Sequence, residues 1–154
     1  MEEFGVPRYH VQVVRESESI YLGRGAVSKA TEVAKTFRDM LGDLPHEEFW
    51  VLYLDTKNVP IGSAMIGRGT INQTLVRAVE VFRYGILLNA LAVVLIHNHP
   101  SGNLEPSKGD RAVTKQLAKA GQILGIKVLD HIIVSSEGIY SFGENYDPSL
   151  NGAD

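Results

Sequence analysis

In the segment Ala92-Val-Val-Leu-Ile-His97-Asn-His99-Pro100 an apolar run stops abruptly at two histidines and a turn. The uninterrupted run 92–96 is typical of a strand that is covered on both faces of a sheet. Pro100 excludes a helical continuation. On an extended backbone, side chains two residues apart point the same way, so His97 and His99 can share one ion. The sequence therefore predicts a buried strand that delivers two imidazoles to a common point.

A carboxylate follows at a spacing that allows it to join the two histidines. Ser107-Lys-Gly-Asp110 comes directly after a proline and opens an amphipathic segment, which places Asp110 in the first turn of a helix. The Pro-Ser-Gly turn at 100–102 can fold that helix back toward the strand. Two imidazoles and one carboxylate, with a fourth position open for water, suit a catalytic zinc ion. Ser107 and Asp110 also form the pattern of a capping box, which needs no metal.

Composition restricts the class of protein and the kind of metal site. With 154 residues, 44% hydrophobic and 21% charged, the chain is long enough for one domain with a hydrophobic core. Cysteine is absent, so disulfides and thiolate zinc sites are excluded and a metal must use His and carboxylate ligands. A net charge of -3 gives no strong footprint for nucleic acid. No leader or membrane span is recognisable, and we expect a cytoplasmic protein without a membrane partner.

Hydrophobic periodicity predicts a mixed α/β domain. An N-terminal extension over 1–26 carries a strand at 9–14, a metal domain spans 27–146, and a polar tail occupies 147–154. Within the metal domain the predicted helices and strands follow one another in the order α, β, β, α, β, α, β, β. The helices are expected at 28–41, with Ser28 as N-cap, at 75–88 and at 110–124; the strands are expected at 49–54, 59–66, 92–96, 127–134 and 138–142.

The motif text resembles a known family. The pattern His97-x-His99-Pro100, followed at fixed spacing by Ser107 and Asp110, resembles the JAMM (MPN+) metalloprotease signature. The longer strings at 97–102, 105–107 and 129–134 are similar to the bacterial RadC branch of that group. The resemblance covers about residues 27 to 146 and implies a three-layer α/β/α sandwich of the JAMM/MPN, cytidine-deaminase-like type, with one zinc ion. Longer family members carry a helix-hairpin-helix region, to which no stretch here corresponds.

Zinc chemistry of this kind needs a carboxylate that is not a ligand to take a proton from the attacking water. The upstream candidates are Glu47, Glu48 and Glu80. The family places such a glutamate two residues before an aromatic that opens the second strand, which maps onto Glu47 through Phe49. Glu48 is the adjacent alternative, and because neighbours on a strand face opposite sides, only one of the two can reach the metal.

The resemblance also implies supporting roles. In JAMM enzymes the serine at the position of Ser107 donates a hydrogen bond to the oxyanion of the tetrahedral intermediate. Asp130 or His131, on a neighbouring predicted strand, could accept or donate a hydrogen bond at the ring nitrogen of a ligating histidine that does not bind the metal. A structural hydrogen-bonded pair accounts for Asp130 and His131 equally well.

The function implied is a zinc-dependent hydrolase that cleaves a peptide, isopeptide or other amide bond with metal-activated water. Its substrate would be a peptide or protein that the sequence does not identify. The alternative is a non-catalytic MPN-like binding module or a DNA-repair accessory protein, as the RadC name implies, because fold alone does not determine function. A homo-oligomer is compatible with either interpretation.

Overall fold

The computed structural model describes residues 5–16, 19–20, 22 and 25–152, and its helices and strands follow the predicted order from residue 27 onward. The elements are α1 (Thr31–Leu41), β1 (Glu48–Leu54), β2 (Pro60–Arg68), α2 (Ala78–Leu87), β3 (Ala92–Asn98), α3 (Lys108–Leu124), β4 (Lys127–Ser135), β5 (Gly138–Ser141) and the 3₁₀ helix η1 (Pro148–Asn151). The predicted α/β class is confirmed.

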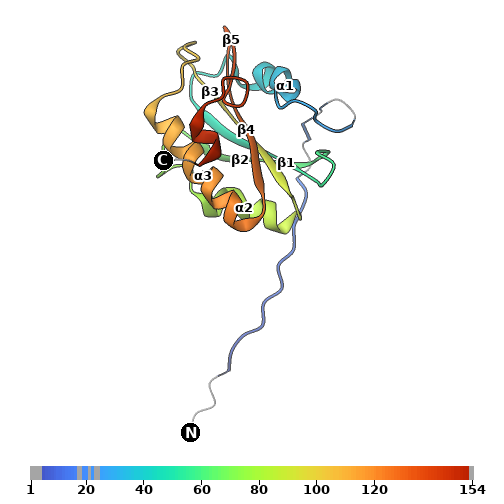
Figure 1. Ribbon diagram of the computed structural model, residues 1–154. Helices are drawn as coiled ribbons and strands as arrows, with labels where there is room; N and C mark the ends of the chain where they lie inside the picture. The colour runs from blue at the N-terminus through green and yellow to red at the C-terminus, as the bar shows by residue number, and fades with distance from the viewer. Residues whose placement is uncertain (1–4, 17–18, 21, 23–24, 153–154) are drawn as a thin grey trace.

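The strands form one mixed sheet in the order β2-β1-β3-β4-β5. The pairs β1–β2, β1–β3 and β4–β5 are antiparallel, whereas β3 and β4 are parallel and are joined through α3, as a parallel pair requires. Helix α1 packs on one face of the sheet, and α2 and α3 pack on the other (Figure 1). The three-layer arrangement predicted from the family resemblance is therefore present.

Strand β3 is the centre of this arrangement. All seven of its residues are buried, because it has a strand on either side and helices on both faces. Val93 and Leu95 face α2 and α3, while Val94 and Ile96 face α1. By the same alternation His97 points to the α2/α3 side. The apolar run thus determines the side of the sheet on which the first histidine lies.

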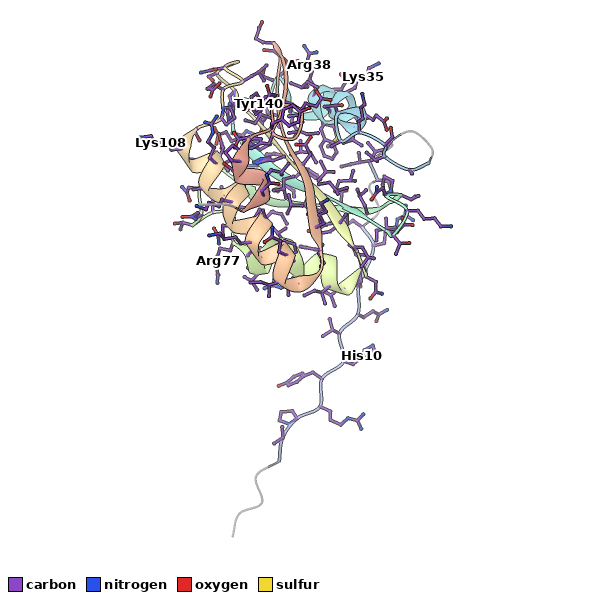
Figure 2. All side chains as sticks on the ribbon, viewed as in Figure 1. His10, Lys35, Arg38, Arg77, Lys108 and Tyr140 are labelled. Carbon is purple, nitrogen blue, oxygen red and sulfur yellow. The ribbon has the colours of Figure 1, made fainter. Side chains whose placement is uncertain are left out.

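The N-terminal prediction was wrong in two respects. Residues 9–14 alternate as a strand would, but they have no strand partner among the described residues and extend away from the domain, as His10 shows (Figures 1 and 2). Helix α1 begins at Thr31, not at Ser28. The Ser28 backbone N–H and hydroxyl both donate to the carboxylate of Glu32, so the serine pairs with the first turn from outside the helix.

The segment predicted as a polar tail, 147–154, is docked on the domain in its described part. Asp147 accepts a hydrogen bond from the Ser149 N–H and so caps η1, which Pro148 opens. Leu150 packs against the core between the sheet and α2/α3. Arg111 of α3 donates to Asp147 at 3.0 Å, so the end of the described chain is docked on the domain. None of the helices in the described part has the length and hydropathy needed to cross a bilayer.

Candidate metal centre

The side chains of His97, His99 and Asp110 converge at the end of β3. The two Nε2 atoms are 3.0 Å apart, and the Asp110 carboxylate oxygens lie 3.1 Å from His97 Nε2 and 3.3 Å from His99 Nε2. All three residues are buried. One potential ligand atom from each lies within 4.8 Å of the others. The predicted ligand set therefore forms a compact N,N,O cluster that could hold a metal ion.

Local structure places each of these three groups. His97 is the sixth residue of β3, and the His99 N–H donates to the Val134 carbonyl at 3.0 Å, which keeps the chain extended beyond the strand. Asp110 is in the first turn of α3. Its backbone N–H donates to Ser107 Oγ at 3.0 Å, and its Oδ2 accepts from the Ser107 N–H at 2.7 Å. The capping box and the metal-ligand interpretation are thus compatible, because one carboxylate caps the helix and also faces the imidazoles.

A chain of buried hydrogen bonds determines which nitrogen of His97 carries a proton. Thr114 Oγ donates to the Asp110 carbonyl at 2.6 Å and lies 2.6 Å from His131 Nδ1. Because a hydroxyl has one proton, Thr114 must accept from a protonated His131 Nδ1. The neutral His131 then presents the lone pair of Nε2 to His97 Nδ1, at 2.7 Å, so His97 donates from Nδ1. The Nε2 atom of a neutral His97 is left with its lone pair toward Asp110.

His99 is oriented by a second carbonyl. Its Nδ1 lies 2.6 Å from the Asn103 carbonyl oxygen, which can only accept, so the ring donates from Nδ1 and a neutral His99 has its lone pair on Nε2. Both imidazoles consequently present lone pairs to the same point. This is how metal-binding histidines are usually oriented, with the other ring nitrogen bonded to a carbonyl or comparable group.

Electrostatics support a neutral His131 and an ionised Asp110. Burial, together with the electrostatic effect of the neighbouring His97 ring, keeps the pKa of His131 well below its ordinary value, so this ring is neutral. Burial acts to raise the pKa of Asp110, but its contacts with His97 and His99, which become hydrogen bonds when these rings are protonated and no metal is bound, outweigh burial and hold that pKa far below the usual range. Burial acts to lower the pKa of His99, yet the Asp110 carboxylate and the Asn103 carbonyl raise it overall. Asp110 therefore remains an anion that attracts positive charge to the cluster.

Of the three candidate glutamates, Glu80 is paired with Arg83 on the surface of α2, and Glu47 and Glu48 lie on different sides of the chain. Glu47 lines a cavity of about 270 Å³ together with His99, Ser107 and Asp110, and its carboxylate accepts the Ile71 N–H at 2.9 Å. Glu48 is turned away from this cavity. Its carboxylate contacts the three side chains of His46, Trp50 and Arg68, each at 2.9 Å. Of the two adjacent carboxylates, only that of Glu47 lines the cavity beside the cluster, as alternation along the strand leads one to expect.

Asn98 holds the backbone on both sides of Glu47, a role that the sequence did not reveal. Its Oδ1 accepts the Glu48 N–H at 2.7 Å, and its Nδ2 donates to the His46 carbonyl at 2.8 Å. These two groups belong to the peptide units that flank Glu47. Because Asn98 follows His97 directly in β3, the same strand positions a ligand and the candidate base.

Ser107 lies in the wall of the same cavity. Its hydroxyl oxygen accepts the Asp110 N–H, whereas its hydroxyl proton has no acceptor among the described residues. That proton is therefore available to a group bound in the cavity.

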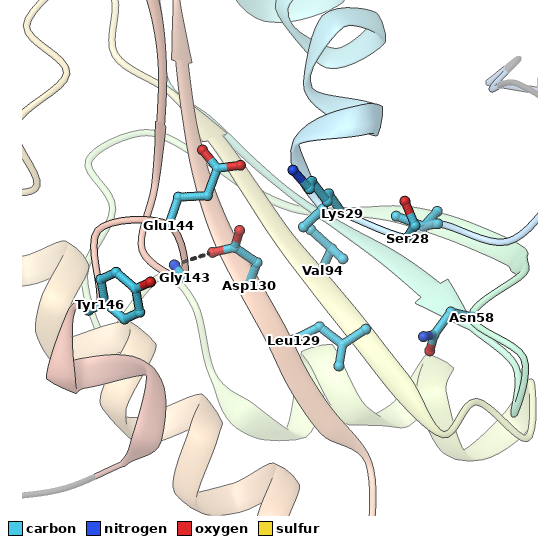
Figure 3. A pocket seen from close by; sticks show the side chains of 11 residues that line it. Ser28, Lys29, Asn58, Val94, Leu129, Asp130, Gly143, Glu144 and Tyr146 are labelled. Atoms are coloured by element: carbon cyan, nitrogen blue, oxygen red, sulfur yellow. Dashed lines mark hydrogen bonds between the residues drawn. The ribbon is translucent and has the colours of Figure 1, made fainter.

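The structure separates Asp130 from His131. His131 contacts His97, as the sequence suggested, but Asp130 was wrongly grouped with it because adjacent strand residues face opposite sides of the sheet. Asp130 lies on the α1 face, beside a separate cavity of about 560 Å³, and accepts the Gly143 N–H at 2.8 Å (Figure 3). The Ser141 hydroxyl and the His131 N–H also donate to it. Burial raises the pKa of Asp130 despite these hydrogen bonds, and the carboxylate anchors the turn after β5.

Comparison with known proteins assigns the chain to a family. A family model described as the RadC-like JAB domain matches residues 27–147. A UPF0758 protein of Finegoldia magna is 51% identical over 104 residues, which are 68% of this chain and 47% of that protein. UPF0758 proteins of Rubrobacter xylanophilus and Flavobacterium johnsoniae are 46% and 40% identical, over 80% and 75% of this chain and 54% and 51% of theirs. The chain thus spans about half the length of these curated relatives. The match over 27–147, which includes every residue of the cluster, shows that the chain belongs to the RadC-like JAB domain family.

Proposed function

We propose that the chain is a zinc-dependent hydrolase that cleaves a peptide, isopeptide or other amide bond. The observation that carries this proposal is the convergence of two imidazole lone pairs and a buried carboxylate beside a cavity that also contains a glutamate outside the ligand set. The donor atoms are nitrogen and oxygen only, which suits zinc with an open fourth position. When bound there, zinc would lower the pKa of a water ligand to about 7 and so supply the nucleophile.

Residues of the chain would then bind the ion, transfer the proton and stabilise the negative charge. His97, His99 and Asp110 hold the ion. Glu47 accepts the proton of the attacking water and passes it to the leaving amine, a role that its position in the cavity wall allows. Ser107 donates its hydroxyl proton to the oxygen that gains negative charge when the amide carbonyl is attacked.

The family match supports this proposal, as does the separation of Glu47 from Glu48. Among the described residues the Glu47 carboxylate accepts one hydrogen bond, from a backbone N–H, whereas the Glu48 carboxylate is held by three side chains. Hydrogen bonds from these partners outweigh burial and lower the pKa of Glu48. A carboxylate fixed in this way is a poor proton carrier, and Glu47 is the better candidate.

The test compares Glu47→Gln with Glu48→Gln as its matched control. Zinc content of protein purified without chelator is measured by mass spectrometry, and hydrolysis is followed on a library of peptides and isopeptide-linked conjugates. Glu47→Gln should retain one zinc per chain and lose about 10²- to 10⁴-fold in turnover, the usual contribution of a general base. Glu48→Gln should retain most of the turnover.

Undiminished turnover in Glu47→Gln would refute the assignment of the base. Stoichiometric zinc without hydrolysis of any substrate by the wild type would favour the non-catalytic binding module.

A further inference from the structure

Residues 9–14, here called the donor segment, have the pattern of a strand without a partner. Tyr9, Val11 and Val13 share one side of the extended chain, and their exposed fractions are 86%, 68% and 45%. The polar His10 and Gln12 alternate with them. No hydrogen bond joins this segment to any other described residue, and it leads away from the sheet (Figure 2). An alternating segment of this kind buries its apolar side only when it joins the edge of a sheet.

The sheet of this chain has two edges, and they are not equivalent. β5 has four residues, whereas β2 has nine. On β2, Ile61 and Met65 are 39% and 41% exposed. Met65 is paired with Trp50, which contributes to the α1-side core, so Met65 points to that face of the sheet. α1 packs mainly over β3, β4 and β5, and although Ile20, Leu22 and Val27 also pack on this core, Met65 remains partly exposed at the β2 end. The edge of β2 thus combines free backbone groups with exposed apolar side chains.

We propose that the donor segment of one copy pairs with the outer edge of β2 in a second copy of this chain. Six residues span roughly 20 Å in a strand, which fits within the nine-residue length of β2. Placed with its apolar side on the α1 face, the segment sets Tyr9, Val11 and Val13 beside Met65 and along the edge that carries Ile61, the residue at the register shift between Pro60 and Gly62. Each copy has one donor segment and one free β2 edge, and two copies that exchange their segments close as a two-fold dimer.

The path of the chain favours a second copy over the segment's own sheet. The Val27 N–H donates to the Asn58 carbonyl at 2.8 Å, which fixes the entry into the domain at the β1–β2 turn. The donor segment extends outward beyond the body of the domain (Figure 1). It is therefore positioned to reach a neighbouring molecule. This inference does not depend on the proposed hydrolase activity or on a bound metal.

The test uses the full chain in sedimentation velocity over a range of concentrations. Val11→Asp combined with Val13→Asp alters the apolar side of the donor segment, and His10→Asp combined with Gln12→Asp alters its polar side. Ile61→Lys alters the β2 edge, and Ile139→Lys is its matched control on β5, since Ile61 and Ile139 are both 39% exposed. All these side chains are exposed, and circular dichroism checks that each variant is folded.

We expect a wild-type dimer whose dissociation constant rises at least tenfold in the Val11/Val13 and Ile61 variants and changes less than threefold in the two controls. Mixing the Val11/Val13 variant with the Ile61 variant should restore part of the dimer, because one intact segment then meets one intact edge. Amide exchange of residues 9–14 should be slower in the dimer. A wild-type monomer at all concentrations, with or without protection of 9–14, would overturn the proposal. So would loss of the dimer in Ile139→Lys with none in Ile61→Lys.

Discussion

Replacing Thr114 by valine tests the hydrogen-bond chain that orients His97. Valine matches threonine closely in shape, so the change removes a hydroxyl and opens no cavity. The lost bonds are the two 2.6 Å contacts to the Asp110 carbonyl and to His131 Nδ1. His131 is fully buried, and leaving its Nδ1–H without an acceptor costs about 1–3 kcal/mol.

His131 can avoid this cost only by changing tautomer, and that change forces His97 to change its tautomer as well. With its proton on Nε2, His131 would donate to His97 Nδ1, and a neutral His97 would then carry its own proton on Nε2. That is the nitrogen that faces Asp110 and His99. Metal binding would have to reverse both tautomers. We therefore expect zinc affinity to fall about 10- to 100-fold, the usual effect of removing a partner that orients a ligand.

The assay is competition for zinc against a chelator of known affinity, combined with guanidinium unfolding of the metal-free protein. Thr114→Ser is the control, because it keeps the hydroxyl and should retain zinc affinity within about threefold. Nitrogen-15 NMR of the imidazoles reports the tautomers directly. Wild-type zinc affinity and unchanged unfolding in Thr114→Val would show that this hydroxyl does not orient His97, and the tautomer argument would fail.

Two further predictions concern residues outside the ligand set. Asn98→Ala removes both hydrogen bonds to the peptide units around Glu47, so turnover should fall at least tenfold while zinc stays bound; kinetics and metal analysis on the same sample check this. Asp147→Asn tests the docked C-terminal segment: burial acts to raise the pKa of Asp147, but hydrogen bonds from Ser149 and the charge of Arg111 lower it overall. A lowered pKa of Asp147 stabilises the folded state at pH values above 3.8, the ordinary pKa of the group. This contribution is lost as the pH falls through the pKa that Asp147 has in the folded state. Unfolding measured from pH 7 to pH 3 should show wild type more stable than the variant at neutral pH, with the difference shrinking below about pH 4. A difference that stays constant over this range would contradict the assignment.

Local spacing was sufficient to predict the ligand cluster. A doubly covered strand, the period of two that joins His97 to His99, and a capped helix that starts with Asp110 are all visible within a short stretch of sequence. The family resemblance added Glu47. Thr114 was missed although it follows Asp110 by four residues on the same helical face, because its partner His131 comes from another strand.

The errors have the same origin in contacts between distant segments. Alternation shows that Asp130 and His131 face opposite sides of β4. Which of the two faces His97 is determined by the register of β4 with β3, and this register shifts between Val93 and Val94. Alternation at residues 9–14 indicates a strand, yet these residues are not paired with any strand of the described chain. Leu150, in a segment that reads as polar, docks because the core offers it an apolar contact.

The same interactions also bear on whether the site exists before the metal arrives. Asp110 is held by the capping box with Ser107, and His99 by the Asn103 carbonyl, neither of which requires an ion. His97 lies within a strand whose two neighbours pair with it along its length. The site is therefore already ordered without an ion. Chelation should lower the melting temperature, because a bound ligand stabilises the folded state, but should not change the far-ultraviolet circular dichroism spectrum. A chain that unfolded on chelation would instead depend on the ion for folding, as zinc fingers do, and these hydrogen bonds would be too weak to preorganise the site.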